Sequence, residues 1–482
     1  MDKGFFARSF HLFLPFCLHF FLKYEKITVY AKPAAEAKIR RYPAFGGKRR
    51  DHPHFIPDYP NFFSGKKQGA AWVSAVIHIF PASNNTTEYI YFYWYSMKGA
   101  RAPTKGWRRM HFRVQTDEMN YGLGMVTRAI SPRPAKAAYD GVLIETENDC
   151  LVLTCTDGEM SIKARVSAIV EEDGLALLPA RLFTEMMRKQ PAGEVDIRIE
   201  GGRKALIRSR GSNTSMACME AEEFPDIGDV NGEYRVSLPC KRFRDAVGKV
   251  LFAVSTDESR KILTGILTEI YEKETLLVGL DGFRLALQRI QAENTLPQGK
   301  NMVSAVVPGK ILGEVGKMLP DSEDDAQIVF NSSHIMYSFG AVKVYATLLT
   351  GEFIDYQKIL PASWTTEVAV MREALSDAIE RCSLMAREGK NNLIYLKLNT
   401  DGKMEMTANA ERGDVHEDID IGIEGNELSI AFNSRYLSDI VHNVDSDRIC
   451  MCFNSNVSPC MIKPVEGNEY TFLVLPVRIF NR

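Results

Sequence analysis

The residues best placed to do chemistry are three carboxylates in strand-like stretches. Asp157 and Glu159 are two residues apart and could share one face of a strand, and Asp281 follows another strand-like run. Converging carboxylates hold the divalent ions that metal-dependent nucleases use. A single close pair is weak support for such a site, because an acidic residue at a strand end commonly accepts hydrogen bonds from backbone N–H groups instead. A nuclease that uses these three residues is therefore kept as an alternative.

The rest of the sequence predicts no catalytic residue, metal or cofactor. It contains no Gly-rich phosphate loop followed by Lys-Ser/Thr, no His-Glu-x-x-His and no nucleophile elbow. Of nine histidines only four follow residue 109, too scattered to nominate a general base. Cys450 and Cys452 would point to the same side of a strand, too close for an ordinary disulfide and too few for a zinc site. We expect reduced, mostly buried cysteines and a cytoplasmic protein.

Charge divides the chain near residue 110. The 482 residues carry a formal net charge of −2. Residues 1–109 hold 18 Lys and Arg against 6 Asp and Glu, a net of +12, together with 24 of the 48 aromatic residues. Residues 110–482 hold the remaining 41 basic and 55 acidic residues, a net of −14. One evolved domain rarely concentrates basic and aromatic residues so strongly, which places a boundary here.

The N-terminal extension, residues 1–109, shows neither helical nor strand periodicity and has four interpretations. Its composition would suit an arm that binds nucleic acid. Its apolar opening could tether a DNA-binding protein to a membrane, but Arg8, Pro15 and two histidines interrupt the run of about 20 apolar residues that a span needs. We favour a start assigned too early, with the true first residue at Met110, or else a disordered extension.

Two landmarks repeat three times after residue 109. The first landmark is a Pro or Asn followed by a small residue and a cation, and it comes at the start of a helix-like apolar stripe. Successive copies of it are 129 and 125 residues apart. Its copies are centred on Pro179, Pro308 and Asn433. The second is an Asp or Asn at the end of a strand-like run, with spacings of 124 and 128 residues. Its copies are Asp157, Asp281 and Asn409. Two landmarks with one period indicate tandem domains of about 125 residues.

Each repeated unit is predicted to be an α+β domain with two helices against largely antiparallel strands. A short strand leads into a helix with one apolar face, formed by Phe243, Val247 and Val250 in the second unit and by Leu375 and Ile379 in the third. Alternating strand-like stretches fill most of the remainder. The predicted domains are 110–230, 231–362 and 363–482.

The predicted helices carry cations although residues 110–482 are acidic overall. Lys241, Arg242 and Lys249 lie opposite the apolar stripe of one helix, and Arg188 lies on another. Acidic residues instead crowd stretches predicted to be loops: 220–229, 321–325 and 411–420. This division would present a basic surface to a polyanion and an acidic surface elsewhere.

Three sequence runs occur in one order along this region: residues 276–286 (LLVGLDGFRLA), 351–361 (GEFIDYQKILP) and 475–479 (LPVRI). In this combination they resemble the bacterial sliding clamp family, the beta subunit of DNA polymerase III. The likeness extends from Met110 to Ile479, and residues 110–112 (MHF) are similar to the family's ordinary start.

The resemblance implies a non-catalytic processivity factor of the DNA polymerase III holoenzyme, a DNA-directed DNA polymerase complex. Two three-domain chains would form a head-to-tail homodimer, a ring whose helices face duplex DNA without reading its sequence. Arg133 and Lys261 stand where the family contacts DNA. Together with the helix cations, the predicted DNA-facing residues are Arg133, Arg188, Lys241, Lys249 and Lys261.

The resemblance also implies a groove between the second and third domains that accepts short hydrophobic peptides from the polymerase catalytic subunit, the clamp loader and repair proteins. Carried over by position, its residues are Leu263, Leu280, Gly282, Phe283, Arg284, Leu285, Ile354, Lys358, Ile359, Leu473, Leu475, Pro476, Val477, Arg478 and Ile479. Several depart from the family pattern: Phe283 replaces a frequent His, Leu280 a Thr, Ile354 a Pro and Lys358 an Arg. Residues 480–482 also extend the usual end. We expect a more apolar groove with an altered peptide preference.

Overall fold

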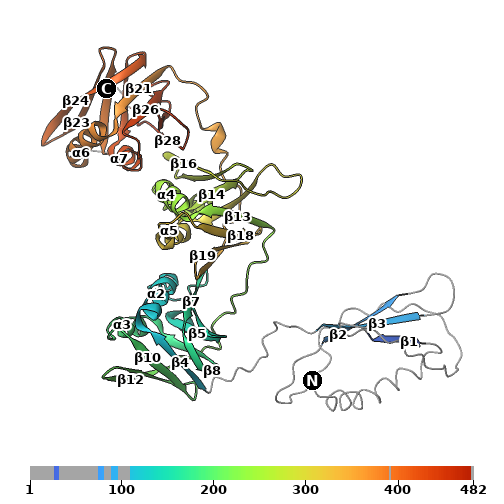
Figure 1. The fold of residues 1–482 in the computed structure, drawn as a ribbon. Coiled ribbons are helices and arrows are strands. Elements are labelled where there is room, and N and C mark those ends of the chain that lie inside the picture. The colour runs from blue at the N-terminus through green and yellow to red at the C-terminus, as the bar shows by residue number, and fades with distance from the viewer. Residues whose placement is uncertain (1–26, 32–73, 81–87, 96–108, 390–391, 479–482) are drawn as a thin grey trace. The chain divides into compact units, whose positions relative to one another are not determined.

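The computed structural model describes residues 27–31, 74–80, 88–95, 109–389 and 392–478 (Figure 1). The chain divides into two units, Met1–Lys105 and Gly106–Arg482. In the first unit β1 (Ile27–Ala31) pairs in parallel with β3 (Glu88–Tyr95), and β2 (Ser74–Phe80) pairs antiparallel with β3. The irregular sequence pattern predicts no strand here. The difference arises because aromatic and β-branched residues favour strands even where they do not alternate with polar ones.

The second unit contains three tandem domains that repeat one order of elements. The first domain consists of β4 (Arg109–Gln115), α2 (Thr116–Val126), η1 (Thr127–Ala129), η2 (Ala137–Asp140), β5 (Gly141–Glu147), β6 (Cys150–Thr156), β7 (Met160–Ser167), β8 (Ile169–Glu172), β9 (Leu175–Pro179), α3 (Ala180–Arg188), β10 (Glu194–Glu200), β11 (Lys204–Ser209) and β12 (Ser212–Ala217).

The second domain consists of β13 (Tyr234–Pro239), α4 (Cys240–Leu251), η3 (Glu258–Thr264), β14 (Gly265–Ile270), β15 (Glu274–Leu280), β16 (Arg284–Gln291), β17 (Val303–Pro308), α5 (Gly309–Met318), β18 (Asp325–Phe330), β19 (His334–Phe339) and β20 (Val342–Thr347). After η4 (Tyr356–Lys358), the third consists of β21 (Thr366–Met371), α6 (Arg372–Glu388), β22 (Leu393–Asn399), β23 (Lys403–Ala410), β24 (Gly413–Gly425), β25 (Leu428–Asn433), α7 (Ser434–His442), β26 (Arg448–Phe453), β27 (Cys460–Pro464) and β28 (Tyr470–Val474).

Two helices pack side by side in each domain, as predicted (Figure 1). The repeated landmark begins the second helix each time: α3 and α5 start directly after Pro179 and Pro308, and α7 starts after Asn433. Proline suits this place because its fixed φ and missing N–H cost a helix start little. The Asn433 side chain instead caps α7 by accepting a hydrogen bond from the backbone N–H of Arg435. The predicted apolar stripes of α4 and α6 are buried.

Two of the sheets continue across domain boundaries. An eight-stranded sheet joins the first and second domains where β7 pairs with β20, and a twelve-stranded sheet joins the second and third where β16 pairs with β28. We call β7, β16 and β24 the edge strands of the three domains, and β12, β20 and β28 their final strands. At both boundaries, therefore, the edge strand of one domain pairs with the final strand of the next.

The two boundaries share the same register. Thr347 N–H donates to the Glu159 carbonyl at 3.2 Å, and Leu475 N–H donates to the Phe283 carbonyl at 2.9 Å. At the other end of each pairing, Arg165 N–H donates to Ala341 and Arg289 N–H to Glu469, at 2.9 and 2.8 Å. The equivalence of these contacts shows that the repeat extends to the way in which its copies are joined.

One stretch predicted as an acidic loop is a strand. Residues 411–420 lie mostly in β24, whose half-buried and exposed positions alternate along its first part. The acidic residues also do not form a surface separate from the helix cations. Arg381 of α6 makes a bidentate contact with Glu417 at 2.8 and 2.9 Å, and Arg244 of α4 contacts Asp321 at 3.1 Å. The predicted division is therefore wrong in these two places, because opposite charges on neighbouring elements pair locally.

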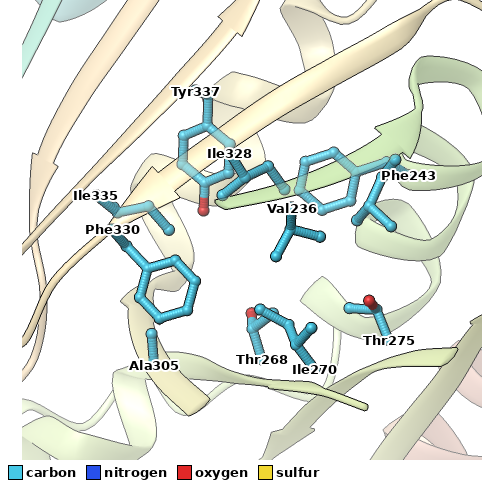
Figure 2. A pocket seen from close by; sticks show the side chains of 11 residues that line it. Val236, Phe243, Thr268, Ile270, Thr275, Ala305, Ile328, Phe330, Ile335 and Tyr337 are labelled. Atoms are coloured by element: carbon cyan, nitrogen blue, oxygen red, sulfur yellow. The ribbon is translucent and has the colours of Figure 1, made fainter. Parts of the chain in front are cut away.

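A small cavity lies in the core of the second domain (Figure 2). Apolar side chains line most of it, and Thr268, Thr275 and Tyr337 contribute hydroxyl groups. Its volume is about 10 Å³, the lower limit for a single water molecule. It is a packing gap between the two sheets of that domain and too small for an organic ligand.

Candidate functional site

The surface at the boundary of the second and third domains is built on the pairing of β16 with β28. The chain after β28 continues this attachment, since Leu475 N–H donates to the Phe283 carbonyl and Val477 N–H donates to the Ala431 carbonyl of β25 at 2.8 Å. Residues 475–477 are half-buried, and Arg478 is exposed. The C-terminal segment is thus held between the two domains.

A tight turn before β16 presents Phe283 to solvent. The Asp281 carboxylate accepts hydrogen bonds from the backbone N–H groups of Phe283 and Arg284 at 2.8 and 3.0 Å. Gly282 has a φ of +95°, which favours glycine because a Cβ would be strained there. The Phe283 side chain is 55% exposed, and its ring stacks on Tyr436 of α7 at 5.8 Å.

Arg284 ties the two domains together from the inner side of this turn. Its side chain is only 10% exposed and contacts the carboxylates of Asp281, at 3.0 Å, and of Asp439 in α7. The guanidinium carbon also lies 4.8 Å from the ring centre of Tyr436 and 5.3 Å from that of Phe252. A planar guanidinium can form several such contacts at once. Arg284 therefore acts as a structural bridge, with its charge already paired.

Leucines predicted to line the groove form its supporting core. Leu263, Leu280, Leu285 and Leu473 are at most 3% exposed and belong to one apolar cluster. Phe353, Leu360 and Leu475 are partly buried against that cluster. The surface itself comes from more exposed neighbours: Phe283, Ile354 and Ile359 are 55%, 39% and 37% exposed. Ile479 lies outside the described residues.

The segment around η4 is anchored by a buried tyrosine that sequence reasoning missed. The Tyr356 hydroxyl donates to the Glu269 carboxylate of β14 at 2.7 Å, and burial raises the pKa of Tyr356. Lys358 is exposed on the other side of the segment and pairs with Asp355 at 2.8 Å. The anchor holds the segment against the apolar cluster, which includes Tyr356 and contacts Phe353 and Leu360. In the sequence, a tyrosine between Ile354 and Ile359 indicated a buried position, but its partner lies 87 residues away.

Comparison with known proteins settles the family. Models of the N-terminal, central and C-terminal domains of the DNA polymerase III beta subunit match residues 110–228, 237–355 and 357–478. The beta sliding clamp of Staphylococcus aureus is 30% identical over 380 residues, which cover 77% of this chain and all of that protein. The chain belongs to the DNA polymerase III beta subunit family, the bacterial sliding clamps.

Solved structures of other sliding clamps share the three-domain architecture. The DNA polymerase sliding clamp from Bacillus subtilis is 29% identical, with a TM-score of 0.74. A DNA polymerase III beta subunit from Eubacterium rectale is 27% identical, with a TM-score of 0.73. Each match covers 77% of this chain and 100% of the other. The protein is accordingly a processivity factor and not an enzyme.

Neither alternative function gains support from these comparisons. In the clamp, the Asp157 carboxylate accepts hydrogen bonds from Glu159 and Met160 backbone N–H groups at 2.9 and 2.8 Å. This is the turn that Asp281 forms in the second domain. Among the described residues, Asp157, Glu159 and Asp281 do not gather into a metal-binding group. No helix in the described part of the chain is long and apolar enough to cross a membrane.

The predicted DNA-facing residues of the clamp fall into two groups. Arg133, Arg188 and Lys261 are exposed, and among the described residues no carboxylate lies within ion-pair distance of them. Lys241 lies 3.9 Å from Asp321, and Lys249 contacts Asp445 of the third domain. The positive charges of Lys241 and Lys249 are therefore partly neutralised within the chain.

We expect Arg284→Lys to destabilise the clamp by about 1.5–3 kcal/mol, because a lysine cannot contact both carboxylates and stack on two rings. In a double-mutant cycle measured by denaturant unfolding, Arg284→Lys and Asp439→Asn should show an interaction energy of about 0.5–3 kcal/mol. Lys358→Ala, which breaks an exposed ion pair of the same boundary, should leave stability unchanged. Equal effects of Arg284→Lys and Lys358→Ala would contradict the bridging role.

Proposed function

We propose that the surface between β16 and β28 is where this clamp binds short hydrophobic peptides of the DNA polymerase III catalytic subunit, the clamp loader and repair proteins. The observation that carries the proposal is the buried leucine cluster at this boundary, against which Phe353, Leu360 and Leu475 are partly buried. Exposed apolar residues adjoin these three: Ile354 and Ile359 are their sequence neighbours, and Phe283 is hydrogen-bonded to Leu475. Contiguous exposed apolar residues on a soluble protein commonly mark an interaction site.

The same geometry defines which peptides should bind. Arg284 is engaged with Asp281 and Asp439, so it is a poor anchor for an acidic peptide side chain. Phe283 adds an aromatic ring beside Tyr436 at the edge of the surface. We expect a preference for peptides with aromatic and aliphatic anchors, which such rings contact well.

We further propose that two copies form the head-to-tail ring by strand pairing between edge strand β24 of one copy and final strand β12 of the other. Edge strand β24 pairs with β23 over residues 413–420, and within the described residues the other side of that stretch has no partner strand. Final strand β12 likewise ends its sheet. Unpaired backbone edges of this kind favour pairing with another chain. Continuing the repeat, β12 of one copy would pair with β24 of the other.

In this ring, DNA is held by encirclement and attracted weakly to exposed cations. Contacts to phosphates position a protein without specifying sequence, which suits sliding. The net charge of −14 for residues 110–482 opposes tight electrostatic adhesion. Arg133, Arg188 and Lys261 are the strongest candidates for DNA contacts, with Lys241 and Lys249 contributing less.

We propose three domains, 110–230, 231–362 and 363–482, with Met110 as the functional start of the clamp. The match of the N-terminal domain model from residue 110 and the charge change at this point support that start. A replication clamp acts on DNA inside the cell, and we propose a cytoplasmic location.

Leu475→Ala combined with Ile359→Ala should weaken binding of a fluorescent peptide copied from the polymerase catalytic subunit by at least about tenfold, because each truncation removes apolar contact at the centre of the surface. Fluorescence anisotropy gives the affinity, and native mass measurement checks that the dimer persists. Leu384→Ala removes an exposed leucine of α6 and serves as the control. Undiminished peptide affinity in the double variant would contradict the assignment.

The repeated register predicts that Thr214 of one copy lies opposite Val415 of the other, within the about 4.4–6.8 Å Cα separation that a disulfide spans. A chain with Thr214→Cys and Val415→Cys should therefore oxidise to covalent dimers, which remain on a circular plasmid in denaturant and leave it after the plasmid is cut. Ser215→Cys with Val415→Cys is the matched control, because those side chains point to opposite faces. Cross-linking in the control alone would refute the register.

Arg133→Ala should reduce the amount of clamp loaded onto nicked circular DNA. It should also reduce, by about one unit, the slope of the logarithm of the DNA-binding constant against the logarithm of the salt concentration. Loading by the clamp loader at several salt concentrations measures both quantities. Arg133→Lys keeps the charge and should restore them. Normal loading of Arg133→Ala would remove this residue from the DNA surface.

A further inference from the structure

Two buried cysteines lie together on the third domain, on the sheet face opposite the helices. Cys450 and Cys452 occupy alternate positions of β26, and their sulfur atoms are 3.6 Å apart. Both residues are at most 2% exposed. Their strand neighbours Ile449 and Met451 point into the main core instead. The cysteine pair therefore forms a separate small cluster with Met461 of β27.

The strand on the other side of β26 adds a carboxylate to this pair. Glu367 of β21 lies directly opposite Cys452, and its Oε2 is 4.0 Å from the Cys452 sulfur. The ligating atoms of Glu367, Cys450 and Cys452 all lie within 4.8 Å of one another. Two thiols and one carboxylate, each able to offer one ligand atom to a cation, therefore lie together on this face of the sheet.

The spacing of these three atoms suits one tetrahedral cation. With Zn–S bonds of about 2.3 Å, two thiolates on a tetrahedral zinc ion are about 3.8 Å apart, and a thiolate and a carboxylate oxygen are about 3.6 Å apart. The observed sulfur separation of 3.6 Å already fits the first value. The Glu367 carboxylate lies 4.0 Å from the Cys452 sulfur and within 4.8 Å of the Cys450 sulfur, so binding requires the Glu367 side chain to move closer to the pair.

Charge and surroundings favour a divalent ion. Two thiolates and one carboxylate carry −3, and a divalent cation leaves −1. Lys463 of β27 supplies the remaining positive charge, with its Nζ 3.6 Å from the Glu367 carboxylate. Lys463 also lies over the ring of Trp364 at 4.3 Å. Glu367 is partly exposed, so its side of the site is open for a water molecule as fourth ligand.

We propose that Cys450, Cys452 and Glu367 form a binding site for one thiophilic divalent cation of the zinc class. Binding forms two metal–sulfur bonds and one metal–oxygen bond, and the two thiol protons pass to solvent. The alternative, a disulfide within the pair, fits the structure less well. The sulfur atoms would have to approach to about 2.05 Å across strand positions whose Cα atoms are about 6.6 Å apart, near the limit for that bond.

The test uses the full chain, reduced and freed of metal, with Zn²⁺ and Co²⁺ as probes. Competition against a chromophoric chelator should give one tight Zn²⁺ per chain, and Co²⁺ should produce a thiolate-to-cobalt charge-transfer band. Cys450→Ser with Cys452→Ser should abolish the band and the tight stoichiometry. Glu367→Gln should weaken Zn²⁺ binding by at least about tenfold, the loss typical even for residues that only support a ligand.

Cys218→Ser is the matched control, because it removes a partly buried thiol in the first domain. It should leave Zn²⁺ affinity and the cobalt band unchanged. If the double serine variant fails to fold, Glu367→Gln decides the question, since its partly exposed side chain is replaced by one of the same size. Three results would overturn the proposal: no tight Zn²⁺ in the natural chain, a cobalt band that survives in Cys450→Ser with Cys452→Ser, or an affinity unaffected by Glu367→Gln.

Discussion

Backbone pairing between neighbouring domains is the constraint on which this structure depends. At each internal boundary the edge strand of one domain pairs with the final strand of the next, with the same register and equivalent hydrogen bonds. A buried backbone N–H or C=O without a partner is costly, so each pairing fixes the position of one domain against the next more strictly than side-chain packing would. The proposed dimer applies the same constraint a third time, between copies.

The proposed peptide-binding surface results from this pairing. The turn that carries Phe283 comes directly before β16, and the segment with Leu475 and Val477 comes directly after β28. Pairing of the two strands therefore brings residues about 190 positions apart into one surface. Arg284 reinforces the arrangement from beneath with two carboxylates from different domains. The same few residues form the hydrophobic surface and the contact between the second and third domains.

Much of the fold could be predicted from the sequence because it is local. The landmarks at Pro179, Pro308 and Asn433 mark helix starts, and the apolar stripes of α4 and α6 follow helical spacing. Strand β24 was mistaken for a loop because its acidic residues concealed a period-two pattern. The roles of Arg284 and Tyr356 could not be predicted, since their partners Asp439 and Glu269 are distant in sequence. The third ligand of the cysteine pair was missed for the same reason, because Glu367 lies on another strand.

The hydrogen bond from Leu475 to Phe283 has a thermodynamic consequence. A peptide that binds only when β16 and β28 are paired must stabilise that pairing by mass action, by about 2.7 kcal/mol when its concentration is one hundred times its dissociation constant. The fraction of clamps with bound peptide and the stability of the β16–β28 pairing are thus linked. A protein partner bound to this surface would therefore strengthen the attachment of the third domain to the second.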